Sequence, residues 1–124
     1  MNALLWVLQF LLAAAFAAHG WLFLSPPASL VEEMNALLPR WFQLFLGGAE
    51  VAAAAGLTLP GLTRIQPRLV PAAAVGIMVV MVGATVLHLA RAEWGSAVTT
   101  FVILLIATFV AHMRWRVRPI QPRR

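Results

Sequence analysis

Polar and charged residues are confined to a few short stretches of this 124-residue chain, and long apolar runs lie between them. An α-helix needs about 20 apolar residues to cross the roughly 30 Å of hydrocarbon in a bilayer. The runs therefore predict an all-α four-helix transmembrane bundle. We expect one membrane domain over residues 1–115, followed by a basic tail at 116–124 that is disordered near the lipid surface. The predicted spans cover residues 3–24, 41–59, 69–90 and 96–113.

Proline and glycine punctuate the boundaries between these runs. Pro26-Pro27 stops the first helix, because proline cannot continue the hydrogen-bond ladder, and Pro60-Gly61 is expected to end the second span. Between them, residues 29–38 predict a short amphipathic helix opened by a Ser-x-x-Glu capping box at Ser29 and Glu32. This helix would either lie on the membrane surface or act as a lid over a pocket.

Composition supports a membrane protein and excludes several other classes. Hydrophobic residues make up 62% of the chain and charged residues only 10%, against about 25% charged in soluble domains. The absence of cysteine excludes disulfides and thiolate metal sites. The net charge of +5 comes from arginines placed beside the spans, which favours contact with anionic lipid, notably at the Arg-rich tail, over binding to nucleic acid.

The distribution of arginine predicts the orientation. Four spans place both termini and the loop between the second and third spans on one side of the membrane. That side carries seven of the nine arginines, whereas the opposite side carries only Arg40 and Arg91, with three glutamates. The positive-inside rule therefore predicts cytoplasmic termini in a bacterial inner membrane. All five tryptophans fall at predicted span boundaries, as in an aromatic belt.

Glu50 is the most informative residue, because it lies near the middle of the second apolar run. An ionisable group at the bilayer midplane costs a few kcal/mol or more, so such a group is normally paired, protonated or used. Helical spacing gathers further polar residues in the outer half of the bundle. They are His19, Gln43, His88, Arg91 and Arg40.

These groups suit three tasks: taking up a proton, relaying it through histidine, or hydrogen-bonding a lipophilic ligand such as a quinone or a sterol. Three structural interpretations remain open beside them. Glu50 could be a protonated hydrogen-bonding link between helices, and His19 could be a buried histidine with its hydrogen bonds satisfied. His88 with Arg91 could only anchor the outer interface. No His-x-x-x-His or Glu-x-x-His spacing supports a metal site.

Small residues recur at four-residue intervals on two of the predicted spans. Such stripes allow helices to pack closely in membranes. Neither a GxGxxG motif nor a P-loop accompanies them, so we expect a role in packing rather than in cofactor binding. The residues are Gly48, Ala52 and Gly56 on the second span and Ala72 and Gly76 on the third.

Two stretches resemble the DoxX-like membrane family. Residues 47–77, GGAEVAAAAGLTLPGLTRIQPRLVPAAAVGI, are similar to the family's pattern of a Gly-x-x-Glu entry, a small-residue run and a proline-flanked restart. Residues 78–95 are similar to its Gly-Ala-x-x-x-His-x-x-Arg segment. The resemblance implies a four-helix membrane bundle and matches Glu50, His88 and Arg91 to the family's motif. The family is named from a subunit of a thiosulfate:quinone oxidoreductase, and relatives resemble accessory or assembly proteins.

Three functions follow as hypotheses. The first is an accessory or assembly subunit that binds a membrane-protein partner or a second copy of itself and is not an enzyme by itself. The second is a quinone-linked subunit of an oxidoreductase, with electrons supplied by a partner because no resident cofactor is evident. The third is a small proton-coupled exporter, which in known four-span examples carries its carboxylate in the first span rather than the second.

Overall fold

The computed structural model describes residues 1–124 and is α-helical throughout. Four helices are long and apolar enough to cross a membrane, the last of them together with a π-helical turn that follows it. A short helix and a 3₁₀ turn connect the first two. The elements are α1 (Asn2–Leu24), η1 (Ala28–Leu30), α2 (Val31–Leu37), α3 (Arg40–Thr63), α4 (Leu69–Ala90), α5 (Trp94–His112) and η2 (Met113–Val117). The predicted all-α class with four candidate spans is thus confirmed.

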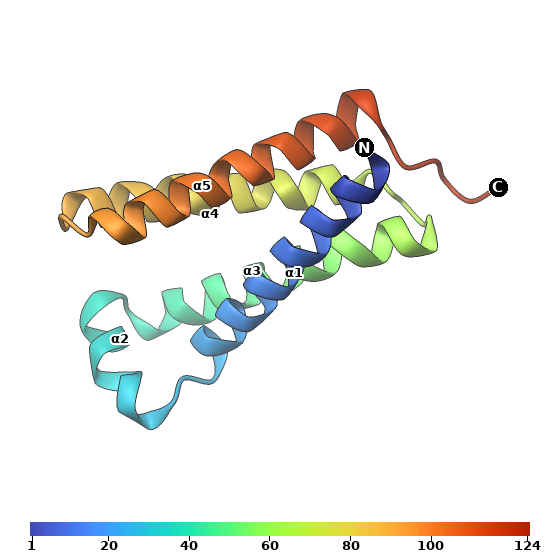
Figure 1. The fold of residues 1–124 in the computed structure, drawn as a ribbon. Coiled ribbons are helices and arrows are strands. Elements are labelled where there is room, and N and C mark those ends of the chain that lie inside the picture. The colour runs from blue at the N-terminus through green and yellow to red at the C-terminus, as the bar shows by residue number, and fades with distance from the viewer.

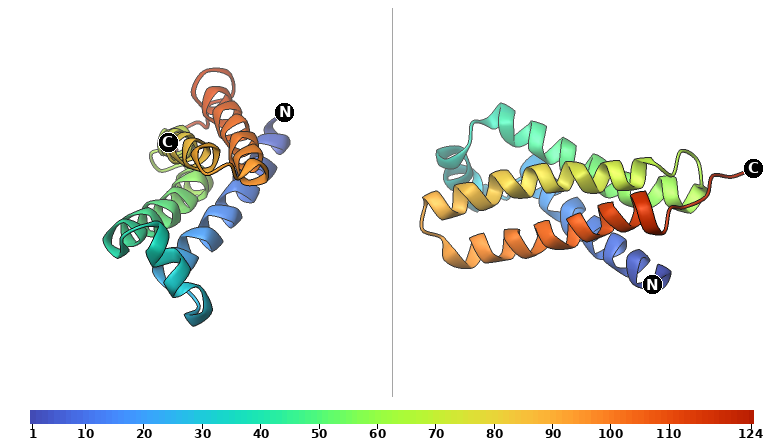
Figure 2. Two further views of the ribbon diagram at one scale, coloured as in Figure 1. Left: turned by 90° about the vertical axis from the view of Figure 1, so that its left-hand side faces the viewer. Right: turned by 90° about the horizontal axis from the view of Figure 1, so that it is seen from above.

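The long helices alternate in direction, so both termini and the α3–α4 loop lie at one end of the molecule (Figure 1). We call this the Arg-rich end. The opposite end, called the α2 end, holds α2 and the α4–α5 turn. The closest partners are α1 with α3 and α4 with α5, and α3 packed against α4 joins the two pairs (Figure 2). Because α1 crosses α3 obliquely, the two pairs diverge toward the α2 end (Figure 1).

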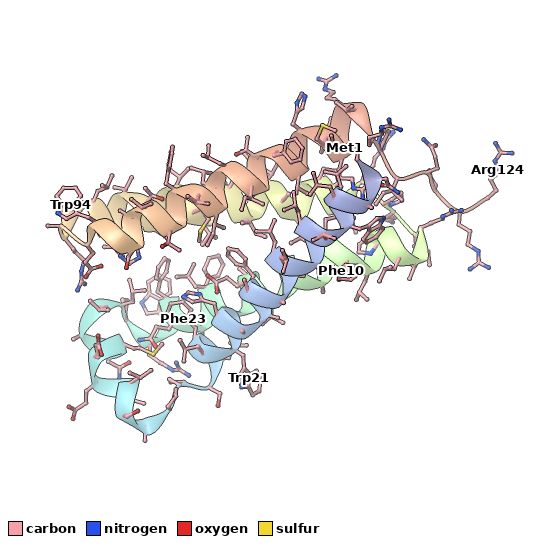
Figure 3. All side chains as sticks on the ribbon, in the orientation of Figure 1. Met1, Phe10, Trp21, Phe23, Trp94 and Arg124 are labelled. Atoms are coloured by element: carbon pink, nitrogen blue, oxygen red, sulfur yellow. The ribbon has the colours of Figure 1, made fainter.

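The core lies where the two pairs meet. Its apolar side chains come from every long helix, for example Phe16, Leu57, Ile77 and Val110. Only 24 of the 124 residues are buried, while large apolar side chains cover the exterior. An apolar exterior of this extent is unfavourable in water and favourable against acyl chains. The molecule is therefore an integral membrane protein in contact with the lipid bilayer. Figure 3 shows the labelled Trp21 extending outward from α1 and Trp94 at the α4–α5 turn.

Two boundary predictions are wrong. Pro60 does not end its helix, because α3 continues through Thr63 and ends where Arg64 adopts a left-handed backbone with φ of 59°. Membrane helices tolerate proline when neighbouring groups satisfy the freed carbonyl. The short helix after the first span is present, but Ser29 does not cap it: the 3₁₀ turn η1 includes Ser29, so α2 starts at Val31 without a side-chain cap.

The last helix also extends beyond its predicted end. After His112 the chain widens into the π-helical turn η2, which closes with a 2.6 Å hydrogen bond from the Arg118 N–H to the Met113 carbonyl. This turn buries Arg114. Residues 118–124 have no regular structure, and the Arg123 N–H donates to the Arg64 carbonyl at 3.0 Å. The tail is therefore held beside the α3–α4 loop.

Candidate functional site

Two glycines bring α1 and α3 into their closest contact. A Cβ atom built on Gly20 would lie 2.8 Å from the Gly47 carbonyl oxygen, and one built on Gly47 would lie 2.7 Å from the Gly20 carbonyl oxygen. No residue with a side chain fits at either position without moving a backbone. We call this contact the crossing point. It follows His19 directly on α1 and precedes Glu50 by one turn on α3, so it places these two residues opposite each other.

At the crossing point His19 and Glu50 form a direct pair. The Nδ1 atom of His19 lies 2.7 Å from Oε2 of Glu50, and only 2% of the Glu50 side chain is exposed. Burying an unpaired carboxylate would be costly, so the pair compensates for much of the cost of placing Glu50 inside the span. Sequence analysis predicted both residues as site candidates, and the structure brings them together.

The second ring nitrogen of His19 is free. Its Nδ1 is bonded to Glu50, while Nε2 makes no hydrogen bond within the protein, and 53% of the side chain is exposed. Phe23 packs edge-on against the ring with centroids 4.9 Å apart and restricts its rotation. A histidine fixed at one nitrogen by a buried carboxyl group and open at the other can donate or accept a proton at the open nitrogen.

Two more predicted candidates lie nearer the α2 end and do not contact Glu50. Arg40 donates to the last carbonyls of α1, at 2.7 Å to Phe23 and 3.0 Å to Leu24, and to the side chain of Gln43 at 3.2 Å. Gln43 in turn donates to Asn35 at 3.0 Å. This network ties the end of α1 and α2 to the start of α3. The network therefore has a structural role, and the amide group of the buried Gln43 has hydrogen-bond partners within it.

The remaining candidates, His88 and Arg91, form a separate cluster at the α4–α5 turn. Both bond to Glu93, through His88 Nδ1 at 2.5 Å and Arg91 Nε at 2.8 Å. The His88 hydrogen bond, with help from Arg91, lowers the pKa of Glu93 against the opposing effect of desolvation. Sequence analysis did not identify Glu93 as the partner of His88. No group of three or more His, Asp or Glu residues is arranged to hold a metal ion.

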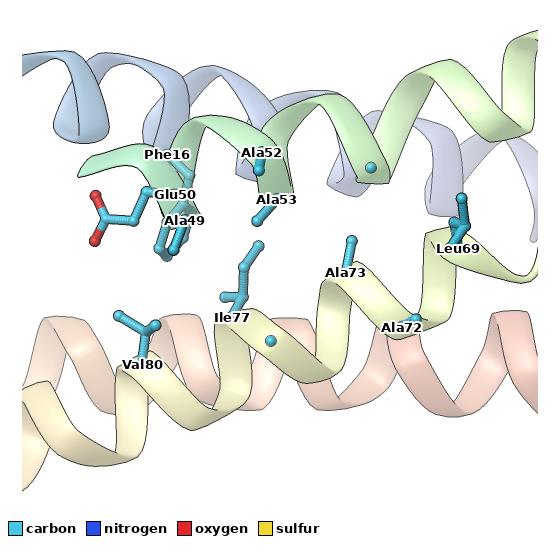
Figure 4. Close-up of a pocket in the computed structure, with 12 residues that line it drawn as sticks. Phe16, Ala49, Glu50, Ala52, Ala53, Leu69, Ala72, Ala73, Ile77 and Val80 are labelled. Carbon is cyan, nitrogen blue, oxygen red and sulfur yellow. The ribbon is translucent and has the colours of Figure 1, made fainter. Parts of the chain in front are cut away.

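Most of the residues predicted for helix packing line a groove. An apolar groove of about 360 Å³ runs between α3 and α4, and Glu50 is the only charged residue on its wall. Figure 4 shows the Glu50 carboxyl group at one end of this groove, pointing away from Ala53 and Ile77. Small side chains leave the space open, and the helices close together at Gly56, where an added Cβ would lie 2.9 Å from Ala73. The predicted residues on the wall are Ala52, Gly56, Ala72 and Gly76.

Gly48 differs from the rest of the predicted stripe. A Cβ atom at Gly48 would meet no atom within 4 Å, so this residue packs against no helix of its own chain. The α1–α3 contact uses the neighbouring Gly47 instead. A shift of one residue along a helix turns the side-chain position by about 100°, which moves it to another face.

A buried polar cluster at the Arg-rich end was not predicted. Arg114 is only 4% exposed, and its Nε donates to Gln9 at 2.6 Å and its Nη1 to Asn2 at 2.7 Å. Gln9 also donates to the Leu57 carbonyl at 2.7 Å, and the guanidinium lies 5.3 Å from the centre of the Trp6 ring. The pairing of Gln9 and Arg114, far apart in sequence, had no signal in local spacing. This cluster connects α1, α3 and η2.

The family assignment agrees with this architecture. The model of the DoxX-like family matches residues 7–111, which include α3 and α4 and most of α1 and α5. The chain belongs to the DoxX-like family. No curated protein and no solved structure matches this DoxX-like protein. The matched region includes the His19–Glu50 pair, the groove and the cluster at the α4–α5 turn, whereas Arg114 and the tail lie outside it.

Proposed function

We propose that this DoxX-like protein is an accessory membrane subunit that holds a lipophilic carbonyl ligand, of the quinone class, at His19. The observation that carries the proposal is the half-exposed His19 ring, fixed through Nδ1 to the buried Glu50 and without a protein partner at Nε2. A free imidazole N–H at membrane depth is a strong hydrogen-bond donor toward a carbonyl oxygen.

The pair would also supply a proton. When Nε2 carries hydrogen and Glu50 is protonated, the imidazole can release a proton at Nε2 and take one from Glu50 at Nδ1. Reduction of a quinone to a quinol consumes two electrons and two protons. The electrons would come from a redox partner protein, and the His19–Glu50 pair would deliver one of the protons to a carbonyl oxygen. This division of labour makes the chain an accessory subunit that is not an enzyme by itself.

We further propose that the Arg-rich end faces the cytoplasm of a bacterial inner membrane. Seven arginines and no Asp or Glu lie at that end, whereas Glu32, Glu33 and Glu93 lie at the α2 end. The positive-inside rule supports this orientation. The His19–Glu50 pair would then lie in the outer half of the bilayer.

The test is extraction of the protein from its native membrane into lipid-preserving nanodiscs, followed by mass spectrometry of bound small molecules and proteins. Wild type is compared with His19→Gln and Glu50→Gln, and His112→Gln serves as the control. His112 is an exposed histidine on α5 at the Arg-rich end and makes no side-chain hydrogen bond, so its loss removes a histidine without touching the site.

We expect a quinone to accompany wild type and His112→Gln and to be lost from His19→Gln. Glu50→Gln should weaken binding less, because an amide can still hydrogen-bond Nδ1 while it cannot release a proton. Absence of quinone from wild type, or equal amounts in all four proteins, would rule out the ligand site. Recovery of a stoichiometric protein partner without any quinone would instead support an assembly role without a bound ligand.

A further inference from the structure

The groove between α3 and α4 adjoins a second cavity at the Arg-rich end. This second cavity has a volume of about 630 Å³ and shares Leu69 and Ala72 with the apolar groove. Its wall is mainly apolar and also includes Gln66, Arg68 and Trp115. The two cavities therefore adjoin at Leu69 and Ala72, and we refer to them together as the cleft, with Arg68 at its outer end.

The length of the cleft matches one leaflet of a bilayer. Its apolar part extends along α4 from Leu69 to Val80. Eleven residues of α-helix at a rise of 1.5 Å cover about 16 Å. The hydrocarbon core of a bilayer is about 30 Å thick, so half of it is about 15 Å. An acyl chain that starts at the Arg68 end would reach the level of Glu50, near the midplane.

The Arg68 end of the cleft is suited to a negative charge. The Arg68 side chain is exposed and makes neither an ion pair nor a hydrogen bond within the protein. The nearest arginines along the chain and in the tail are also unpaired, and no Asp or Glu lies at this end. Trp115, exposed beside the opening, is of the residue type that prefers the level of lipid headgroups.

We propose that this cleft binds one anionic phospholipid, with an acyl chain in the α3–α4 groove and the headgroup phosphate at Arg68. The site differs from general attraction between a basic tail and an anionic surface, because it requires both a free groove and one particular arginine. The carboxyl group of Glu50 lies at the far end of the groove and points away from Ala53 and Ile77, so the acyl chain meets mainly apolar walls (Figure 4). The proposal is independent of the proposed quinone site, because that site is centred on His19, which lines neither cavity.

The experiment measures binding of phosphatidylglycerol and phosphatidylcholine with identical acyl chains to the full-length protein by native mass spectrometry. Arg68→Gln tests the headgroup contact, and Arg124→Gln, which removes the same charge from the same end without lining the cleft, is its control. Gly76→Leu fills the groove, because the space beside Gly76 is open. Gly48→Leu is the matched control, since Gly48 also has open space but lines neither cavity.

General attraction to anionic lipid predicts equal losses for Arg68→Gln and Arg124→Gln. A charge-assisted contact adds about 1.5 kcal/mol or more, so the site predicts a further loss of about tenfold for Arg68→Gln in the affinity for phosphatidylglycerol. Gly76→Leu should weaken both lipids and Gly48→Leu neither. Equal behaviour of the two arginine variants, or unchanged binding in Gly76→Leu, would overturn the proposal. His19→Gln should retain the lipid, so failure here is distinguishable from failure of the quinone site.

Discussion

Substitution of Gly20 by alanine tests how the site is assembled. The added Cβ would lie 2.8 Å from the Gly47 carbonyl oxygen and 3.0 Å from the Glu50 Cβ. Ordinary van der Waals contact begins at 3.4 Å, so the shortest contact is 0.6 Å too close. The obstructing atom belongs to the backbone, so the helices themselves must separate. The side chains that depend on the crossing point must separate with them.

The size of the effect follows from that displacement. If the helices part along the line that joins His19 to Glu50, the 2.7 Å contact between them lengthens. It would reach about 3.3 Å, beyond the usual range of about 2.7–3.2 Å for a hydrogen bond to nitrogen. Overpacking of a tight contact costs about 1–3 kcal/mol. Relative to Gly48→Ala, which shares the gain in helix propensity, we therefore expect Gly20→Ala to lower the free energy of unfolding by about 1–3 kcal/mol and to weaken the His19–Glu50 bond.

Two measurements are needed, because loss of stability alone would not show that the pair has opened. Unfolding in mixed micelles, followed by tryptophan fluorescence, gives the free energy of unfolding. The carboxyl stretching band of Glu50 in the infrared spectrum reports its hydrogen bond and is assigned with Glu50→Gln. Gly48→Ala is the control, because its Cβ meets no atom and alanine favours the helix by about 1 kcal/mol. If Gly20→Ala and Gly48→Ala had equal stability and neither shifted the carboxyl band, the crossing point would not be what positions the His19–Glu50 pair.

Three further predictions concern other parts of the molecule. Arg114→Met should lower stability by about 1–3 kcal/mol, because it leaves the side-chain oxygens of Gln9 and Asn2 unpaired. Arg116 is exposed, so Arg116→Met should change stability little, and thermal melts of the two variants test the difference. Because the pKa of Glu93 is lowered in the folded protein, the ionised Glu93 side chain stabilises the fold fully above pH 4.5, and this stabilisation is lost as pH falls through the folded-state pKa. The melting temperatures of wild type and Glu93→Gln should therefore differ above pH 4.5 and converge in acid. The chain has no cysteine, so Arg124→Cys introduces a single thiol at the Arg-rich end. If that end faces the cytoplasm, the thiol should not react with an impermeant maleimide in intact cells, and a reaction would show the opposite orientation.

The membrane helices could be predicted from the sequence because the relevant signal is local. A run of about 20 apolar residues specifies a span regardless of what it packs against. Helix ends were less predictable. Pro60 is a helix breaker in water, yet α3 continues through it to Thr63, as proline is tolerated in membrane helices. The π-helical turn η2 depends on where Arg114 finds partners on α1, which local spacing does not encode.

The candidate site was predictable residue by residue but not as an arrangement. The polarity of Glu50 and His19 within apolar runs identified both residues, because burial of such groups is costly anywhere in a span. Assigning their partners required knowledge of which helices cross and where. Periodicity placed His88 at a similar end of the bundle, yet divergence of the two helix pairs leaves it beside Glu93 instead of Glu50.

The glycines show why spacing alone could not resolve the arrangement. Gly47 and Gly48 are adjacent, and the four-residue pattern selected Gly48 because it repeats with Ala52 and Gly56. The structure uses Gly47 for a backbone contact and leaves Gly48 open, while Ala52 and Gly56 line the groove. A small residue can permit close helix packing or leave a space that a ligand fills, and only its position relative to a second helix distinguishes the two. In this DoxX-like protein the close contact of Gly20 with Gly47 positions the His19–Glu50 pair, and that of Gly56 with Ala73 brings α3 to α4. Gly76, by contrast, leaves open space in the groove between those two helices.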